Sequence, residues 1–109
     1  YPWGDEPPTV ERANFGRLVG APTPVGAYPS GAGAFGHLDL AGNISEWCRD
    51  AAETPERELS WGQKHVLKGG SWWQESVGTL AAADTCYGYS KTRYAYRGFR
   101  IAMVDDVEE

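Results

Sequence analysis

The sequence predicts a loop-rich α+β domain with short antiparallel strands and little helix. Fourteen glycines and seven prolines in 109 residues interrupt the chain too often for long regular elements. Hydrophobic residues make up 41% of the chain and include five tryptophans, which is typical of a packed core and not of a disordered segment. At this length we expect one domain, spanning residues 1–109.

The charge balance narrows the partners that the chain is expected to bind. A formal net charge of −5, with ten Lys and Arg residues in all, provides no basic stripe for nucleic-acid phosphates or for an anionic membrane surface. No apolar run approaches the roughly 20 residues that a spanning helix requires. The opening residues YPWGDEPP lack the basic start and apolar stretch of a signal peptide, so the sequence assigns no compartment. We expect neither nucleic-acid binding nor membrane insertion.

The first third of the chain is expected to be irregular. Residues 1–34 show almost no periodicity, and residues 10–17 could form one helical turn before Gly16 and Gly20 interrupt it. Prolines and glycines then follow one another closely as far as Gly33. Such a segment either approaches a ligand or covers the core, and the sequence leaves both interpretations open.

The second half of the chain contains the strand patterns. Residues 51–63 are polar and predict a surface loop. Residues 65–73 predict a strand, a turn and a strand, with a double glycine at 69–70 that indicates a bulge or a close backbone approach. Residues 99–104 give the clearest strand, because apolar side chains occupy every second position. The acidic tail, residues 105–109, is expected to fray.

The stretch from Gly36 to Asp50, GHLDLAGNISEWCRD, carries the densest set of oxygen ligands. Asp39, Asn43 and Glu46 surround a turn at Gly42, where glycine allows backbone carbonyls to turn inward. Oxygen donors in irregular geometry suit Ca²⁺, whereas Mg²⁺ requires a stricter octahedron. The alternative is a turn in which Asp39 and Asn43 bond their own backbone and Glu46 faces solvent.

The cysteines and histidines form no cluster. Cys48 and Cys86 lie far apart without the spacing of a zinc site. We expect them to be free, buried thiols, although a disulfide stays open. His37 and His65 are isolated, and we assign them no catalytic role.

Several motifs occur in an order that resembles the formylglycine-generating (sulfatase-modifying factor) family. They are YPWGDE, Asn14 within ANF, PVGAYP, GAFGHLDLAGNISEWCRD, VLKGGSW and the closing GFR. The resemblance implies a C-type lectin-like fold of the formylglycine-generating type. It covers nearly the whole chain but corresponds to the C-terminal part of the family's usual domain.

The resemblance also implies a structural Ca²⁺ in the central stretch. The matching ligands are the side chains of Asp39 and Glu46 and the carbonyls of Gly42 and Ile44. A second calcium site in the family uses an asparagine matching Asn14 together with an aspartate in the following loop. The sequence has no aspartate between Asn14 and Asp39, so the second site is not expected.

The catalytic cysteines of the resembling enzymes are not matched. Catalytic members carry two cysteines after the GGS motif that bind copper, and these positions fall at about Gln74 and Thr79 here. Neither side chain supplies the thiolate that Cu(I) prefers. We therefore expect a non-catalytic domain. The alternatives are an oxidoreductase of this family and a fragment that completes such a domain with an N-terminal segment or chain.

One branch of the same fold also departs in this way: the variable proteins of diversity-generating retroelements. They end in a variable segment between a GGSW-like motif and a terminal GFR, and the spacing from Leu80 to Arg100 is similar, with Arg93 and the closing GFR in register. The positions that the resemblance marks as variable are Asp84, Cys86, Tyr87, Gly88, Tyr89, Tyr94, Ala95 and Tyr96.

The residue types in this segment independently favour a recognition surface. Tyr87 and Tyr89, like Tyr94 and Tyr96, alternate, so each pair shares one face of an extended segment. Tyrosine suits interfaces because it is large and amphipathic and loses little side-chain entropy. The alternative is a Tyr-rich strand pair buried against the tryptophans. We expect a protein or glycan ligand on a face that contains Trp72, Trp73, Asp84, Cys86, Tyr87, Tyr89, Tyr94 and Tyr96.

Overall fold

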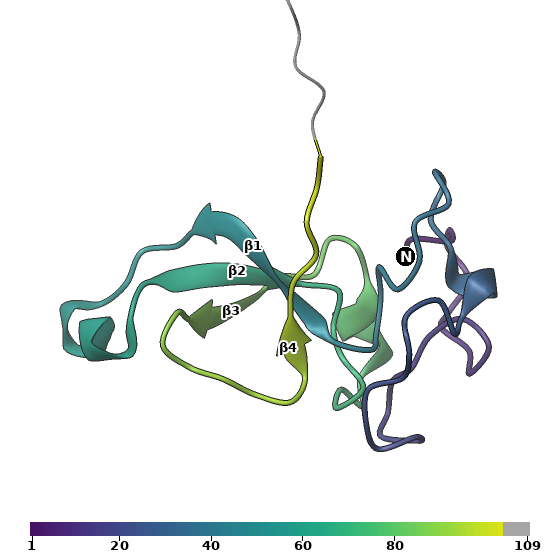
Figure 1. The fold of residues 1–109 in the computed structure, drawn as a ribbon, viewed down its shortest axis with the longest axis horizontal. Coiled ribbons are helices and arrows are strands. Elements are labelled where there is room, and N and C mark those ends of the chain that lie inside the picture. Colours follow the sequence, from purple (N-terminus) through teal and green to yellow (C-terminus); the bar gives the residue numbers. More distant parts are fainter. Residues whose placement is uncertain (104–109) are drawn as a thin grey trace, which may run out of the picture.

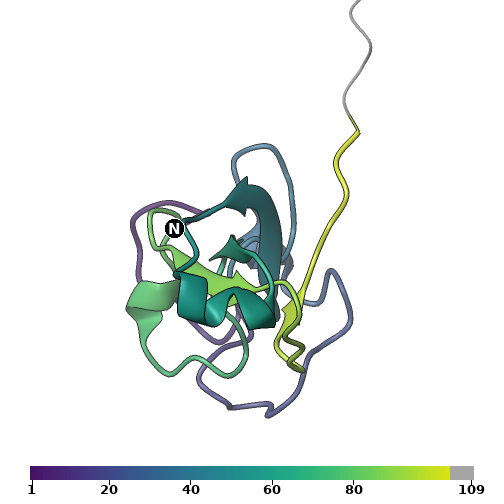
Figure 2. The same cartoon turned by 90° about the vertical axis from the view of Figure 1, so that its left-hand side faces the viewer.

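The computed structural model describes residues 1–103. One curled four-stranded sheet lies beside a large body of irregular chain, and Figures 1 and 2 show the two halves from directions 90° apart. The strands are β1 (Ser45–Ala51), β2 (Lys64–Lys68), β3 (Cys86–Tyr89) and β4 (Arg97–Gly98). Three 3-10 turns accompany them: η1 (Pro29–Gly31), η2 (Glu56–Trp61) and η3 (Val77–Leu80). The predicted loop-rich fold with little helix is confirmed.

The sheet has the order β3-β2-β1-β4 and is mixed. Strand β2 pairs antiparallel with both β1 and β3, and β4 runs parallel to β1. Strand β1 begins directly after the glycine turn, so Glu46 and Trp47 lie opposite Lys68 and Leu67 of β2. The central stretch therefore supplies an inner strand, which the sequence did not predict.

The predicted strand over residues 99–104 is wrong for the part that the structure describes. Strand β4 ends at Gly98, and residues 99–103 leave the body of the domain in both views. Phe99, Ile101 and Met103 are 73%, 87% and 94% exposed, and Val104 lies outside the described residues. Alternation shows which face of a segment is apolar, but a strand also requires a neighbouring backbone to hydrogen-bond with.

The prediction over residues 65–73 is half confirmed. Its first part is β2, whereas residues 71–73 turn away from the sheet. Gly69 and Gly70 have φ angles of +97° and +66°, and a Cβ on Gly70 would lie 2.9 Å from the Thr79 carbonyl oxygen. The double glycine is thus a close backbone approach. The polar loop over residues 51–63 also contains η2.

The small core lies between the sheet and the irregular half. Ala13, Ala41 and Leu80 are buried together, and the aromatic rings of Tyr1, Trp3 and Phe15 pack against them. Residues 1–15 therefore cover the core, whereas Val25 in the following loop is 89% exposed and lines a cavity together with Gly26. No helix in residues 1–103 is long and apolar enough to cross a membrane.

Two buried asparagines join the irregular half to the sheet. Asn43 Oδ1 accepts hydrogen bonds from the Thr23 N–H at 2.8 Å and from Asn14 Nδ2 at 3.3 Å, and Asn43 Nδ2 donates to the Thr23 carbonyl at 3.2 Å. Asn43 also binds the Asn14 carbonyl and the Trp72 N–H through its own backbone. Four segments of chain therefore meet at Asn43.

Candidate functional site

Three aromatic side chains from two segments form a continuous stack. The Trp73 and Tyr96 rings lie 6.0 Å apart at 16°, and the Tyr96 and Tyr94 rings lie 5.1 Å apart at 20°. The guanidinium carbon of Arg17 lies 3.5 Å from the Trp73 ring centroid, and that of Arg97 lies 4.3 Å from the Tyr94 centroid. We call Trp73, Tyr96 and Tyr94 the aromatic stack. Arg17 therefore lies over the Trp73 end of the stack, whereas Arg97 lies beside Tyr94 and Tyr96, 5.8 Å from the Tyr96 centroid.

Trp72 supports the stack from one side. Its ring meets Trp73 at 5.8 Å and Tyr96 at 6.5 Å, nearly edge-on in both cases. Its indole N–H donates to the Ala95 carbonyl at 3.3 Å. Trp72 therefore fixes the loop that carries Tyr94 and Tyr96, whereas Trp73 is 43% exposed and can contact a ligand.

A groove of about 380 Å³ begins beside the stack. Tyr87 and Tyr89 of β3 line it, and Trp61, at the end of η2, meets Tyr89 edge-on at 5.3 Å. The Tyr89 hydroxyl donates to the Glu58 carboxylate, which raises the pKa of Tyr89. We call this the aromatic groove, and its lining is Trp61, Tyr87, Gly88, Tyr89, Thr92, Tyr94 and Arg97.

The structure thus brings most of the predicted ligand-binding residues together. Tyr87, Tyr89, Tyr94, Tyr96 and Trp73 belong to the groove or the stack. The residues that sequence reasoning missed are Trp61, Thr92 and Arg97. A tryptophan in an otherwise polar loop was the available signal for Trp61.

Two predicted binding residues lie apart from the groove lining. Asp84 precedes β3, and its carbonyl accepts a hydrogen bond from Lys68 Nζ at 3.0 Å. Cys86 is exposed at the start of β3, opposite Leu67. Both lie toward one end of β3, whereas Tyr89 and Trp61 meet at the other.

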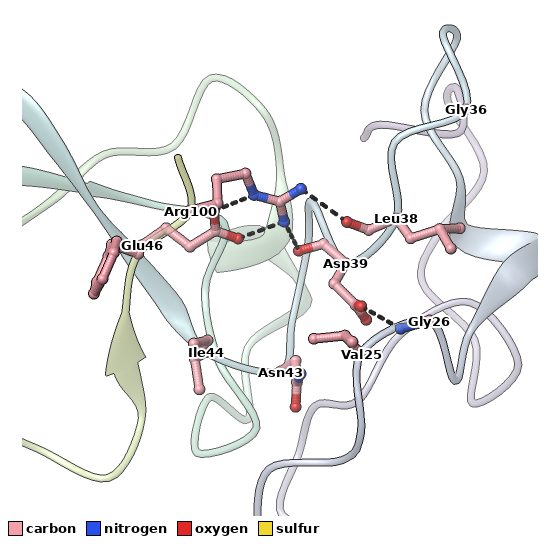
Figure 3. A pocket seen from close by; sticks show the side chains of 10 residues that line it. Val25, Gly26, Gly36, Leu38, Asp39, Asn43, Ile44, Glu46 and Arg100 are labelled. Atoms are coloured by element: carbon pink, nitrogen blue, oxygen red, sulfur yellow. Dashed lines mark hydrogen bonds and ion pairs between the residues drawn. The ribbon is translucent and has the colours of Figure 1, made fainter. Parts of the chain in front are cut away.

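Three of the four predicted calcium ligands, Asp39, Ile44 and Glu46, line a second cavity of about 600 Å³, and Gly42 is not part of that lining. Figure 3 shows the Arg100 guanidinium between the Glu46 carboxylate and the backbone at residues 38–39. Arg100 donates to both Glu46 oxygens, to the Leu38 carbonyl at 3.0 Å and to the Asp39 carbonyl at 2.9 Å. The hydrogen bond to Glu46 raises the pKa of Arg100, so this side chain is a fixed positive charge.

The two carboxylates of the predicted site face different partners. Asp39 Oδ2 accepts the Gly26 N–H at 2.8 Å, while Glu46 faces Arg100 (Figure 3). The side chains of Asp39 and Asn43 accept hydrogen bonds from the backbone of Gly26 and Thr23, not from the backbone of their own turn. The alternative of a turn closed by its own side chains is therefore wrong for these two residues. Within residues 1–103 no three His, Cys, Asp or Glu side chains form a metal-binding group. Calcium at Asp39, Gly42, Ile44 and Glu46 therefore stays a prediction.

Asn14 retains one buried oxygen without a partner in the described part of the chain. Its side chain is 2% exposed, and Nδ2 donates to the Ala21 carbonyl at 2.9 Å, but Oδ1 accepts no hydrogen bond there. A buried carbonyl-type oxygen of this kind suits a water molecule or a hard cation.

Comparison with known proteins identifies the fold and its family. The profile of the sulfatase-modifying factor enzyme 1-like domain matches residues 1–104. The chain belongs to this family. The predicted resemblance is confirmed, and with it the C-type lectin-like fold of the formylglycine-generating type.

The relatives of this sulfatase-modifying factor-like domain include enzymes. Hercynine oxygenase of Mycobacterium tuberculosis is 34% identical over 113 residues, covering 94% of this chain and 26% of the relative. The hercynine oxygenase of Mycolicibacterium thermoresistibile is 38% identical over 117 residues, covering 94% of this chain and 26% of the relative. The chain thus spans about a quarter of the length of these curated relatives.

Two solved structures share the fold. Treponema denticola variable protein 1 superposes with a TM-score of 0.66 at 25% identity, covering 82% of this chain and 34% of that chain. CarF gives a TM-score of 0.65 at 19% identity, covering 84% and 32%, which shows the fold alone. The family relatives therefore include both oxygenases and a variable protein.

The residues at the positions expected for the family's catalytic cysteines, Gln74 and Thr79, form hydrogen bonds within the chain. The Gln74 carbonyl accepts the Gly16 N–H at 2.6 Å, and Thr79 Oγ1 donates to the Ser76 carbonyl at 2.7 Å. The chain's own cysteines are both free, as predicted, but Cys86 is exposed and Cys48 is half-buried, so the prediction that both are buried is wrong. They lie on β3 and β1 with β2 between them.

Cys48 should react slowly with alkylating reagents. Burial raises its pKa, and the negative charge of Asp50 acts in the same direction, so less reactive thiolate is present at a given pH. In the Cys86→Ser variant, we expect the pH at half-maximal iodoacetamide rate to lie higher for folded than for denatured protein. Because folding favours the neutral thiol, this group's stabilising contribution is lost as pH rises through the folded pKa. Equal pH profiles in both states would contradict this expectation.

Proposed function

We propose that this chain is a non-catalytic recognition domain that binds a ligand on the aromatic stack and the aromatic groove. The observation that carries the proposal is the convergence of Tyr87, Tyr89, Tyr94 and Tyr96, from two separate segments, onto one exposed face with Trp73. A tyrosine surface provides apolar area and hydroxyl groups at low entropic cost. Tyr87 and Tyr94 remain 49% and 48% exposed, which counts against a purely internal role.

A screen followed by paired substitutions tests this proposal. The wild-type domain is first applied to a glycan array and to a displayed peptide library. For any binder found, we expect the double variant Tyr87→Ala/Tyr94→Ala to bind at least tenfold more weakly, because interface energy concentrates in a few aromatic side chains. Tyr28→Ala removes a tyrosine from the opposite, irregular half and serves as the matched control. Unchanged affinity in the double variant would overturn the proposal.

We further propose that the segment from Asp84 to Tyr96 is diversified by a retroelement. The structural likeness to Treponema denticola variable protein 1 supports this assignment. The gene neighbourhood tests it, since a reverse transcriptase gene and a near-copy of the segment ending in GFR should lie close by. If the neighbourhood contains neither a reverse transcriptase gene nor such a near-copy, the result counts against the proposal.

An oxidoreductase is the second candidate function, and the identity to hercynine oxygenases favours it. The absence of cysteines at Gln74 and Thr79 in the sequence counts against the copper chemistry of the formylglycine-generating enzymes. Oxygen consumption with Cu(I) and a cysteine-containing peptide tests that branch. Turnover that survives in the Cys48→Ser/Cys86→Ser variant would point to a contaminant.

For calcium we propose that Asp39 and Glu46, with the carbonyls of Gly42 and Ile44, bind the ion in competition with Arg100. The guanidinium already supplies positive charge to Glu46, so Ca²⁺ must displace it or share that carboxylate. Arg100→Gln should therefore raise the apparent Ca²⁺ affinity at least tenfold, read as the rise in melting temperature across a calcium titration. Glu46→Gln in the same background should remove the effect. If the rise in melting temperature with calcium is the same in the wild type and in both variants, the proposal is contradicted.

We also propose that further polypeptide covers the apolar side chains at residues 99–103. Ile101 and Met103 are almost fully exposed and Phe99 is 73% exposed, and the curated relatives are about four times longer than the stretch that they share with this chain. A backbone segment of that longer polypeptide would pair with residues 99–103 and bury these side chains. Amide exchange in the longer protein tests this. Residues 99–103 should be protected there, and rapid exchange at these positions would overturn the proposal.

A further inference from the structure

The aromatic groove carries one positive charge and no carboxylate in its lining. Besides the tyrosines, Arg97 is the only ionisable residue in the groove lining. Lys64 lies just outside the groove, with its Nζ 4.8 Å from the Tyr87 ring centroid. The nearby Glu58 carboxylate already accepts the Tyr89 hydroxyl. A ligand in this groove would therefore meet a locally positive field on a chain whose formal net charge is −5.

Arg97 is held in place without a charged partner. Its guanidinium stacks on Tyr94 at 4.3 Å and lies 5.5 Å from the Trp47 centroid. Nη1 donates to Thr92 Oγ1 at 2.9 Å, and within residues 1–103 no carboxylate lies within 4.0 Å of Arg97. Arg12, Arg17, Arg57 and Arg100 each have such a partner. A positioned guanidinium with unused N–H groups is suited to a carboxylate, which it binds through two parallel hydrogen bonds.

The walls of the groove provide the complementary contacts for a flat, hydroxyl-bearing ring. Trp61, Tyr87 and Tyr94 present aromatic surface, which packs against the C–H face of a sugar ring. The hydroxyls of Tyr87 and Tyr94 and the indole N–H of Trp61 make no hydrogen bond in the described structure, so they can bond to ring hydroxyls. A groove of about 380 Å³ has room for one monosaccharide residue and is open at the surface.

We propose that the aromatic groove binds an acidic sugar residue, a hexuronate, with its carboxylate on Arg97 and its ring against Trp61, Tyr87 and Tyr94. This inference rests on the proposed recognition function and specifies its ligand class. The carboxylate provides the negatively charged partner that Arg97 lacks within residues 1–103, and the ring hydroxyls can bond to the unpaired polar groups of the walls. A neutral hexose makes the same ring contacts without the ion pair.

Calorimetric or NMR titration with D-glucuronate and D-glucose tests the proposal. We expect the wild-type domain to bind glucuronate at least tenfold more tightly than glucose, with an affinity that falls as salt is added. Arg97→Met should remove the preference and Arg97→Lys should retain part of it. Arg93→Met removes an exposed arginine from the same loop, outside the groove lining, and should leave it unchanged. Melting curves verify that each variant is folded.

Three results would overturn the hexuronate proposal. They are equal binding of glucuronate and glucose, unchanged binding in folded Arg97→Met, and preferential binding of 4-hydroxyphenylacetate, an aromatic carboxylate without ring hydroxyls. If Tyr87→Ala/Tyr94→Ala abolishes the binding of a screened ligand while none of these sugars binds, the recognition function stands and the hexuronate assignment fails. If neither the tyrosine nor the Arg97 variants alter any binding, both fail.

Discussion

Replacing Asn43 with alanine should lower the free energy of unfolding by roughly 3 kcal/mol, or on the order of 15 °C in melting temperature. Two effects combine. Alanine removes the hydrogen bonds of Asn43 to Asn14 and Thr23 and leaves partly buried groups unsatisfied. Asn43 also has a φ angle of +65°, where asparagine is tolerated and alanine is strained. Denaturant unfolding followed by tryptophan fluorescence measures the change.

Two further substitutions at position 43 separate these effects. Glycine accepts the positive φ but forms none of the side-chain hydrogen bonds, so Asn43→Gly should be about 1 kcal/mol more stable than Asn43→Ala. Aspartate keeps an acceptor for the Thr23 N–H and should lose the least. If alanine and glycine destabilise equally, backbone strain contributes nothing. If alanine costs less than about 1 kcal/mol, Asn43 is not the junction between the two halves.

The sequence was informative about the fold wherever a motif dictates local backbone geometry. The turn at Gly42-Asn43 and the close approach at Gly69-Gly70 follow from residues that tolerate positive φ, and both are present. The strand over residues 99–104 failed because alternation carries no information about which backbone lies alongside. Strand β1 (Ser45–Ala51) was missed for a related reason. It follows a motif that was interpreted as a set of oxygen ligands, and such a motif also carries no information about strand pairing.

The binding face was predictable in its tyrosines but not in its charge. Tyr87, Tyr89, Tyr94 and Tyr96 are close in sequence, and their alternation indicates a shared surface. Trp61 reaches the groove through a tertiary contact with Tyr89, whereas Arg97 directly follows Tyr96 and contacts Tyr94 within one turn, which the alternation of the tyrosines did not indicate. Likewise, the ion pair of Glu46 with Arg100 joins residues 54 positions apart, which no local pattern reveals.

Replacing Gly88 with alanine should destabilise the domain by about 1–3 kcal/mol and weaken binding in the aromatic groove. A Cβ at this buried position would lie 2.7 Å from Trp47 Cη2, 2.9 Å from Trp47 Cζ3 and 3.0 Å from Arg97 Nη1. The Trp47 ring reaches Gly88 from β1, so Trp47, Arg97 or β3 must move. Gly78→Ala is the matched control, because its Cβ would meet only Ser76 Oγ, at an ordinary 3.6 Å.

The same geometry constrains how the face can be diversified. Gly88 is one of the positions expected to vary, yet any side chain there displaces the tryptophan beneath it and the arginine beside it. Its neighbours Tyr87 and Cys86 are exposed and have no such restriction. In saturation libraries at positions 87 and 88, selected for folded protein, position 87 should therefore accept most residues and position 88 should return glycine. Equal tolerance at both positions, or a Gly88→Ala variant that melts and binds like the wild type, would show that β3 moves to accommodate a side chain. Variation would then extend through the whole strand, and Arg97 could not be a fixed part of the site.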